Sequence, residues 1–161
     1  MNSLEFAIKM ELDGQEYYLK CAEKNKDNRL HNLFLSLAAD EENHGKIIKN
    51  KLDEISYKLE ENASLKDFDN VFKTTAEFTS EIKALPDQMD MYRAALEKEK
   101  QSIDLYQKLM AEATDDNEKS LYDFLIKQET HHFSILEDLI LMIKKSEDWV
   151  ENAEFGVREE Y

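Results

Sequence analysis

The sequence predicts an all-α fold, a four-helix bundle made of two antiparallel helix hairpins joined by a long crossover. Apolar residues recur at helical spacing in four segments of the chain. The 161 residues contain only three Gly and one Pro, too little turn-forming sequence for a multi-stranded sheet. Short polar runs separate the first segment from the second and the third from the fourth, and short joins make neighbouring helices antiparallel.

The four predicted helices cover approximately residues 3–25, 30–61, 87–113 and 117–145. Polar runs at 25–28 and 114–117 form the two short joins. The crossover spans about 62–86 and is expected to contain a short helix, with Ser64 as a plausible N-cap. Pro86 lacks a backbone N–H, which a first helical turn does not need, so it marks the start of the third helix.

The chain is expected to form one domain and a tail. Residues 1–145 make up the bundle, and residues 146–161 follow it. Because the tail contains Trp149, Phe155 and Tyr161, we expect it to pack on the bundle or on a partner chain.

The composition excludes several classes of protein. Lys and Arg number 21 against 36 Asp and Glu, so the net charge is 21 − 36 = −15, which repels phosphate backbones and anionic lipids. We therefore expect neither nucleic acid nor membrane as a partner. The single cysteine, Cys21, excludes an internal disulfide and a Cys-x-x-Cys metal site. With no signal-peptide pattern and no apolar run long enough for a membrane span, the sequence predicts a cytoplasmic protein.

The two predicted hairpins resemble one another in sequence. A shift of 88 residues (99 − 11 = 88) aligns Glu11/Glu99, Tyr18/Tyr106, Leu33/Leu121, Leu37/Leu125, Glu41/Glu129, His44/His132 and Ile47/Ile135. The apolar matches carry little weight, because any two helices with similar patterns would share them. The charged matches indicate an internal duplication.

Each predicted helix carries one glutamate in the middle of its apolar seam. In the second helix the seam is Leu30, Phe34, Leu37, Glu41, His44, Ile48 and Ile55. In the fourth helix it is Leu121, Leu125, Glu129, His132, Leu136, Leu139 and Ile143. The seams of the first and third helices contain Glu11 and Glu99. Packing the four seams together gathers the glutamates at one level of the bundle, with the two histidines one turn away.

Four carboxylates in an apolar interior require positive charge. Each would destabilise the fold by several kcal/mol if left ionised and unpaired, against a total stability of about 5 to 15 kcal/mol. The seams contain no Lys or Arg at that level, whereas two divalent cations balance four glutamates. The sequence therefore predicts a dinuclear metal site formed by Glu11, Glu41, His44, Glu99, Glu129 and His132.

The spacing of these residues supports the same prediction. Each histidine follows a glutamate by three residues, in EENH and ETHH, so an oxygen and a nitrogen on one helix face can bind one ion. Each motif also lies 30 residues after a glutamate of the partner helix (41 − 11 = 30, 129 − 99 = 30). Mixed oxygen and nitrogen ligands without thiolates favour iron or manganese over structural zinc.

With these motifs the sequence resembles the ferritin-like di-iron carboxylate proteins and, within them, the rubrerythrin-type domain. The resemblance covers residues 3 to about 145, and it implies two iron ions, with manganese as the alternative. It also implies bridging ligands at Glu41 and Glu129, terminal ligands at Glu11 and Glu99, and one histidine ligand for each metal, His44 and His132. Tyr18 and Tyr106 are interpreted either as hydrogen-bond donors to the ligating glutamates or as core residues.

The sequence departs from rubrerythrin in two respects. Full-length rubrerythrins carry a rubredoxin-like domain with four cysteines, which this chain lacks, so electrons must come from an external donor such as a rubredoxin-like protein. They also place an extra glutamate one turn after the ligand of the third helix, where this chain has Ser102. This chain therefore lacks the glutamate that takes part in the ligand switching associated with rubrerythrin's peroxide chemistry.

The leading functional hypothesis is a di-iron oxidoreductase that reduces hydrogen peroxide or dioxygen. A ferritin-like protein for iron storage or buffering is the first alternative, and it would need a large hollow assembly, whereas the enzyme is expected to be a homodimer. A dimanganese catalase-like enzyme and a di-iron hydroxylase are further alternatives. The hydroxylase would need a deep apolar pocket beside the metals.

Overall fold

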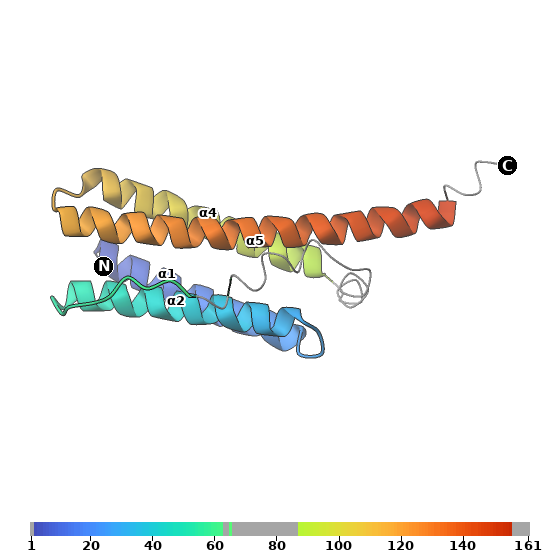
Figure 1. The fold of residues 1–161 in the computed structure, drawn as a ribbon, viewed down its shortest axis with the longest axis horizontal. Coiled ribbons are helices and arrows are strands. Elements are labelled where there is room, and N and C mark those ends of the chain that lie inside the picture. The colour runs from blue at the N-terminus through green and yellow to red at the C-terminus, as the bar shows by residue number, and fades with distance from the viewer. Residues whose placement is uncertain (1, 63–64, 66–86, 156–161) are drawn as a thin grey trace.

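Four long helices make up most of the described part of the chain. The computed structural model describes residues 2–62, 65 and 87–155, with side chains up to 145. The helices are α1 (Ser3–Lys24), α2 (Leu30–Leu52), α4 (Gln88–Glu112) and α5 (Asp116–Phe155). α1 packs along α2 and α4 along α5, and the two hairpins lie against each other (Figure 1). The predicted all-α bundle of two hairpins is confirmed.

Local sequence explains how the first hairpin begins and turns. The Asn2 side chain accepts a hydrogen bond from the N–H of Glu5 at 2.8 Å, and the Glu5 carboxylate accepts one from the N–H of Asn2 at 3.2 Å. In the turn between α1 and α2, the buried Asn25 amide donates to the carbonyl of Cys21 at 2.8 Å and to the hydroxyl of Tyr92 at 3.0 Å. Asn25 therefore ties this turn to α4 of the other hairpin.

Two apolar clusters fill the bundle, one on each side of a polar layer. Toward the α1–α2 turn, Phe34 of α2 stacks on Tyr92 of α4 with 5.3 Å between ring centroids. Toward the other end, Ile48 of α2 belongs to the same cluster as Tyr106 of α4 and Leu121 of α5. In every helix the central glutamate lies in sequence between residues of the two clusters. The four glutamates consequently share one level of the bundle, as predicted.

The second helix ends earlier than the sequence predicts. α2 stops at Leu52 rather than near 61, and Ile55, a predicted seam residue, is 55% exposed. Glu54 adopts the left-handed conformation with φ 58°, and the N–H of Ile55 donates to the carbonyl of Asn50 at 2.7 Å. Glycine normally occupies the left-handed position of this C-terminal motif, so no glycine marks the end of the helix in the sequence.

The fourth helix is longer than predicted. α5 continues to Phe155 instead of ending near 145, and it extends past its neighbours in Figure 1. No Gly or Pro occurs between 145 and 155, and the next residue in the sequence is Gly156. The packing of 146–161 on the bundle or on a partner stays a prediction, because the side chains of this segment lie outside the described residues.

The third helix starts one residue after the predicted range of about 87–113 and two residues after Pro86. α4 begins at Gln88, after Asp87 in the left-handed conformation with φ 58°. Pro86, the predicted helix start, and Ser64, the predicted N-cap, lie outside the described residues, as does most of the crossover.

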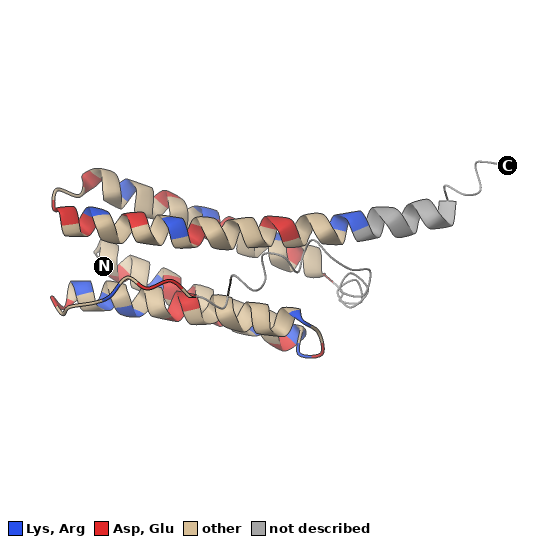
Figure 2. Ribbon diagram, viewed as in Figure 1, with Lys and Arg blue, Asp and Glu red and all other residues tan. Residues whose placement is uncertain are grey.

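The outer faces of the helices carry charges of both signs, as Figure 2 shows. Several pairs lie one turn apart, such as Lys9 and Asp13 at 3.3 Å and Lys49 and Asp53 at 3.0 Å. Exposed pairs of this kind contribute little to stability. Within the described residues, no helix combines the length and the apolar character that crossing a bilayer would need.

Candidate metal centre

One buried glutamate from each helix reaches the polar layer in the middle of the bundle. Glu11 comes from α1, Glu41 from α2, Glu99 from α4 and Glu129 from α5, and none is more than 3% exposed. The two histidines that follow Glu41 and Glu129 by three residues are fully buried in the same layer. The structure thus brings together all six residues that the sequence predicts as metal ligands.

The six side chains form two overlapping groups of potential ligand atoms. The first group is Glu11, Glu41, His44 and Glu129, and the second is Glu41, Glu99, Glu129 and His132. Within each group the atoms lie within 4.8 Å of one another. Glu41 and Glu129 belong to both groups. Two neighbouring ions that share two carboxylates would need this arrangement.

Each imidazole turns its Nδ1 atom toward the carboxylates. Nδ1 of His132 lies 3.0 Å from Oε1 of Glu41, 3.3 Å from Oε1 of Glu99 and 3.4 Å from Oε2 of Glu129. Nδ1 of His44 lies 3.0 Å from Oε1 of Glu129. A single proton on Nδ1 cannot satisfy three carboxylates, whereas a cation at this point can bind several of them together with the ring nitrogen.

The second ring nitrogen of each histidine has a partner of its own. Nε2 of His132 lies 2.7 Å from Oδ2 of Asp40, and Nε2 of His44 lies 3.4 Å from Oε1 of Gln128. Both partners are buried. A proton on Nε2 leaves the lone pair of Nδ1 free for a metal. Sequence reasoning missed Asp40 and Gln128, although the shift of 88 residues also pairs these two positions (128 − 40 = 88).

Two buried tyrosines link the hairpins at the polar layer. The hydroxyl of Tyr18 on α1 donates to Oε1 of Glu99 on α4, and the hydroxyl of Tyr106 on α4 donates to Oε1 of Glu11 on α1. The structure therefore contains the hydrogen bonds that one of the two interpretations of these tyrosines predicts. Each tyrosine occupies one oxygen of its glutamate and leaves Oε2 for another ligand.

Four buried carboxylate oxygens in the layer make no hydrogen bond of proper geometry among the described residues, although three of them lie 3.0 to 3.4 Å from Nδ1 of a histidine. They are Oε2 of Glu11, Oε1 of Glu41, Oε2 of Glu99 and Oε2 of Glu129. No Lys or Arg is among the buried residues of the described chain. A buried polar group without a partner costs about 1–3 kcal/mol, and more when it is charged. The donor set and its unsatisfied oxygens fit a pair of divalent cations.

Without cations, the layer favours protonated glutamates. Burial, and next the charge of Glu129, raises the pKa of Glu11 and that of Glu99. Burial and the surrounding carboxylates raise the pKa of Glu41 well above its usual value. Burial also opposes the ionisation of Glu129, but hydrogen bonds from Glu99 and both histidines hold its pKa well below the usual range. A metal must therefore displace protons from most of the carboxylates.

The histidines retain protons for the opposite reason. Burial lowers the pKa of His44, yet the carboxylates of Glu11 and Glu129 outweigh that effect and raise it to about 10. Burial likewise lowers the pKa of His132, while the charge of Glu99 and the hydrogen bond with Asp40 raise it well above the usual value. Metal binding at Nδ1 requires these protons to leave as well.

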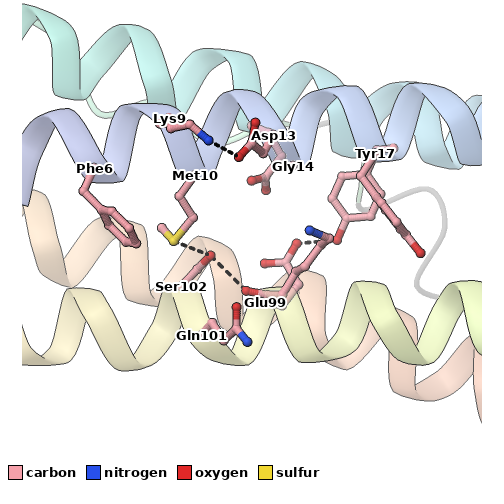
Figure 3. A pocket seen from close by; sticks show the side chains of 12 residues that line it. Phe6, Lys9, Met10, Asp13, Gly14, Tyr17, Glu99, Gln101 and Ser102 are labelled. Atoms are coloured by element: carbon pink, nitrogen blue, oxygen red, sulfur yellow. Dashed lines mark hydrogen bonds and ion pairs between the residues drawn. The ribbon is translucent and has the colours of Figure 1, made fainter.

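A small cavity between α1 and α4 reaches the polar layer. Its volume is about 200 Å³, and Glu41 and Glu99 are among the side chains that line it (Figure 3). Gly14 lies on the α1 side, where an added Cβ would come within 2.8 Å of Oε2 of Glu41. Ser102 lies on the α4 side, with its hydroxyl 3.5 Å from Sδ of Met10. The cavity therefore adjoins two of the four carboxylates.

Two other potentially reactive residues lie outside the layer. Nδ1 of His31 lies 2.8 Å from the carbonyl oxygen of Ala22 and takes no part in the ligand groups. Cys21 is fully buried, and burial raises the pKa of its thiol to about 12. A cysteine in this environment is structural.

Comparison with known families agrees with the geometry. The chain matches the rubrerythrin family model over residues 2–140, a range that contains all six side chains of the two ligand groups. Searches of curated proteins and of solved structures found no significant match. Since the family match covers far more than half of the 161 residues, the chain belongs to the rubrerythrin family.

Proposed function

We propose that this protein is a di-iron oxidoreductase that reduces hydrogen peroxide or dioxygen with electrons from an external donor. The observation that carries the proposal is the pair of buried ligand groups that share Glu41 and Glu129. Oxygen and nitrogen donors without thiolates suit iron, with manganese as the alternative metal. Membership of the rubrerythrin family supports the same chemistry.

In this proposal the side chains divide the work of holding the metals. Glu41 and Glu129, which belong to both ligand groups, would be shared by the two ions, while Glu11 with His44 would hold one ion and Glu99 with His132 the other. When bound, a ferrous pair supplies Lewis acidity and two electrons, the number needed to reduce one peroxide to two waters with two protons.

The two tyrosines keep the terminal glutamates in place. The hydroxyl of Tyr18 donates to Oε1 of Glu99 and that of Tyr106 to Oε1 of Glu11, so Oε2 of each glutamate would be available to hold a metal. Because each bond joins α1 to α4, the tyrosines also keep the two hairpins at a constant spacing around the centre.

The cavity between α1 and α4 supports a small oxidant as the substrate. Its volume of about 200 Å³ is below the roughly 300–1,000 Å³ of pockets that hold drug-sized ligands. Its lining mixes the apolar side chains of Phe6 and Met10 with polar groups such as Ser102. Peroxide and dioxygen fit such a cavity, whereas a hydroxylase acting on a bulky substrate would need more room.

An anaerobic titration of the metal-free protein with Fe²⁺ tests this proposal. We expect two Fe²⁺ to bind per chain and hydrogen peroxide to oxidise them faster than dioxygen does. Binding of less than one Fe²⁺ per chain, or no oxidation by either compound, would contradict the proposal. Elemental analysis of the purified protein distinguishes iron from manganese.

The electron donor and the assembly form the rest of the proposal. The one cysteine of these 161 residues cannot build a four-cysteine rubredoxin site, and we propose that an external donor, such as a rubredoxin-like protein, delivers the electrons. We expect a homodimer that functions in the cytoplasm. Gel filtration distinguishes this small oligomer from the large hollow shell that the iron-storage alternative needs.

A further inference from the structure

The two halves of the centre are nearly equivalent in sequence but differ in one charge. The shift of 88 residues that pairs His44 with His132 also pairs Asp40 with Gln128. The ligand glutamates and the tyrosines are identical in the two halves. Among the described residues that are buried in this layer, Asp40 and Gln128 are the pair whose members differ in charge.

The two partners reach across the hairpins to opposite histidines. Asp40 on α2 contacts His132 on α5, and Gln128 on α5 contacts His44 on α2. The first contact, 2.7 Å between Nε2 and Oδ2, has the length of a charge-assisted hydrogen bond. The second, 3.4 Å between Nε2 and Oε1, is long for any hydrogen bond. Nε2 of His132 therefore has a close carboxylate partner, whereas Nε2 of His44 has a more distant amide partner.

This difference changes the strength of the two nitrogen ligands. A carboxylate that accepts the Nε2 proton fixes the tautomer and the orientation of the ring and makes Nδ1 more electron-rich. An amide oxygen at a longer distance does both less well. Asp40 also adds a negative charge beside one metal position, which favours a cation there. Loss of such an outer partner weakens metal binding by about 10–100-fold in known sites.

We propose that Asp40 is a positioning residue that makes the His132 half of the centre bind its metal more tightly, so that the two metals load in order. The metal held by Glu99 and His132 binds first, and the metal held by Glu11 and His44 binds second. This inference rests on the dinuclear centre of the proposed function.

Titration of the metal-free full chain with Co²⁺ tests the order of loading. Calorimetry is expected to show two binding steps that differ by at least about tenfold in affinity. The chain contains four histidines, so a ¹³C–¹H spectrum of histidine-labelled protein resolves each ring. At one Co²⁺ per chain, the large contact shifts of a coordinated ring should appear at His132 before His44, because the two ring centroids lie 5.9 Å apart and through-space broadening alone would affect both.

Two isosteric substitutions exchange the charges of the two halves. Asp40→Asn should weaken the tighter step by about 10–100-fold and remove the difference between the steps. Gln128→Glu should tighten the weaker step. In the double variant Asp40→Asn/Gln128→Glu, the contact shifts should appear at His44 first. A purely structural role for Asp40 does not predict this reversal.

A neighbouring acidic residue provides the matched control. Glu42 lies on α2 beside Glu41, but its side chain is partly exposed and accepts a hydrogen bond from Gln15 at 3.3 Å. Glu42→Gln removes one negative charge close to the centre without touching a histidine. It should change neither the separation of the two steps nor their order.

The outcomes separate this inference from the proposed function. Two Co²⁺ that bind the wild type with equal affinity, or an order that survives Asp40→Asn, would overturn the role of Asp40 and leave the dinuclear centre standing. Binding of no Co²⁺, or of one per chain, would overturn both. If Asp40→Asn fails to fold by circular dichroism, the response of the weaker step to Gln128→Glu decides.

Discussion

The apolar clusters and the polar layer between them are buried to a similar degree, but they act on stability in opposite directions. Phe34 and Leu121 lose contact with water entirely and stabilise the fold by about 25 cal/mol for each Å² of apolar area buried. The four glutamates also lose their hydration, yet four of their oxygens gain no hydrogen bond in return. The apolar clusters stabilise the bundle, whereas the polar layer costs stability unless cations bind to its carboxylates.

The largest expected effect is the loss of metal binding when a shared carboxylate is removed. Glu41→Ala or Glu129→Ala deletes a side chain that both ligand groups contain, so Fe²⁺ binding should fall by more than about 100-fold. The metal-free Glu41→Ala variant should lose less stability than a core truncation does, because the deleted carboxyl group is buried with an oxygen that has no hydrogen-bond partner. Metal titration and chemical denaturation measure the two quantities.

The control for these variants is Glu42→Ala, on the partly exposed side of α2. It should retain two metals per chain. If Glu41→Ala kept full metal affinity, or if it destabilised the metal-free protein as much as a core truncation does, the contrast between layer and clusters would be wrong.

A truncation in an apolar cluster should produce the opposite pattern. Phe34→Ala removes a fully buried ring that stacks on Tyr92 and Tyr18, and it should lower the free energy of unfolding by about 3–5 kcal/mol. Urea denaturation of the metal-free protein measures this loss. Leu35→Ala, at a residue that is 39% exposed, is the neighbouring control and should cost far less.

The pH dependence of stability should differ between the metal-free and metal-bound protein. The raised pKa values of Glu11, Glu41 and Glu99 mean that the folded state keeps protons above pH 4.5, and His44 keeps its proton up to about pH 10 instead of 6.5. The free energy of unfolding of the metal-free protein should therefore fall as the pH rises from 6 to 9.

Bound metal replaces these protons, so the decline should be smaller in the metal-bound protein and metal binding should release protons. Thermal unfolding at several pH values tests the first expectation, and calorimetry in buffers of different ionisation enthalpy tests the second. A stability of the metal-free protein that rises between pH 6 and 9 would contradict the buried, protonated layer.

The smallest expected effects come from two glycines that face the layer differently. A Cβ at Gly14 would lie 2.8 Å from Oε2 of Glu41, whereas a Cβ at Gly45 would meet only ordinary contacts of 3.7 Å or more. Gly14→Ala should displace the shared carboxylate and lower metal affinity several-fold. Gly45→Ala should leave metal binding unchanged and stabilise α2 by up to about 1 kcal/mol. Equal metal affinities in the two variants would contradict this prediction, since the Glu41 side chain would then move away from the added methyl group without loss of metal binding.

The clustering of the six candidate ligands was largely predictable from the sequence because each Glu-x-x-His pair is local to one helix. Glu41 and His44 are three residues apart, so any helix through them places both on one face, and the repeated motif at Glu129 and His132 identifies the partner. Asp40 was not predictable in the same way. In a chain with 36 acidic residues, an aspartate such as Asp40 is expected at the surface. Only the contact between α2 and α5 brings Asp40 to His132.

The predicted ends of α2 and α5 were wrong because no Gly or Pro marks the point where the prediction placed them. The end of α2 depends on Glu54 taking a conformation that glycine normally takes, which no pattern of apolar residues reveals. The end of α5 was placed too early because the apolar seam fades near 145, although no helix-breaking residue occurs before Gly156. Periodicity locates the buried face of a helix, whereas the conformation of one or two residues decides where the helix ends.

The division of the six side chains between the hairpins has a consequence for the order of events during synthesis. Neither hairpin contains a complete ligand group, and both tyrosine bonds join α1 to α4. During synthesis, the centre cannot assemble until His132 has left the ribosomal exit tunnel. The first hairpin leaves the tunnel earlier. Until then, Glu11, Glu41 and the apolar face of the first hairpin lack the partners that the second hairpin provides.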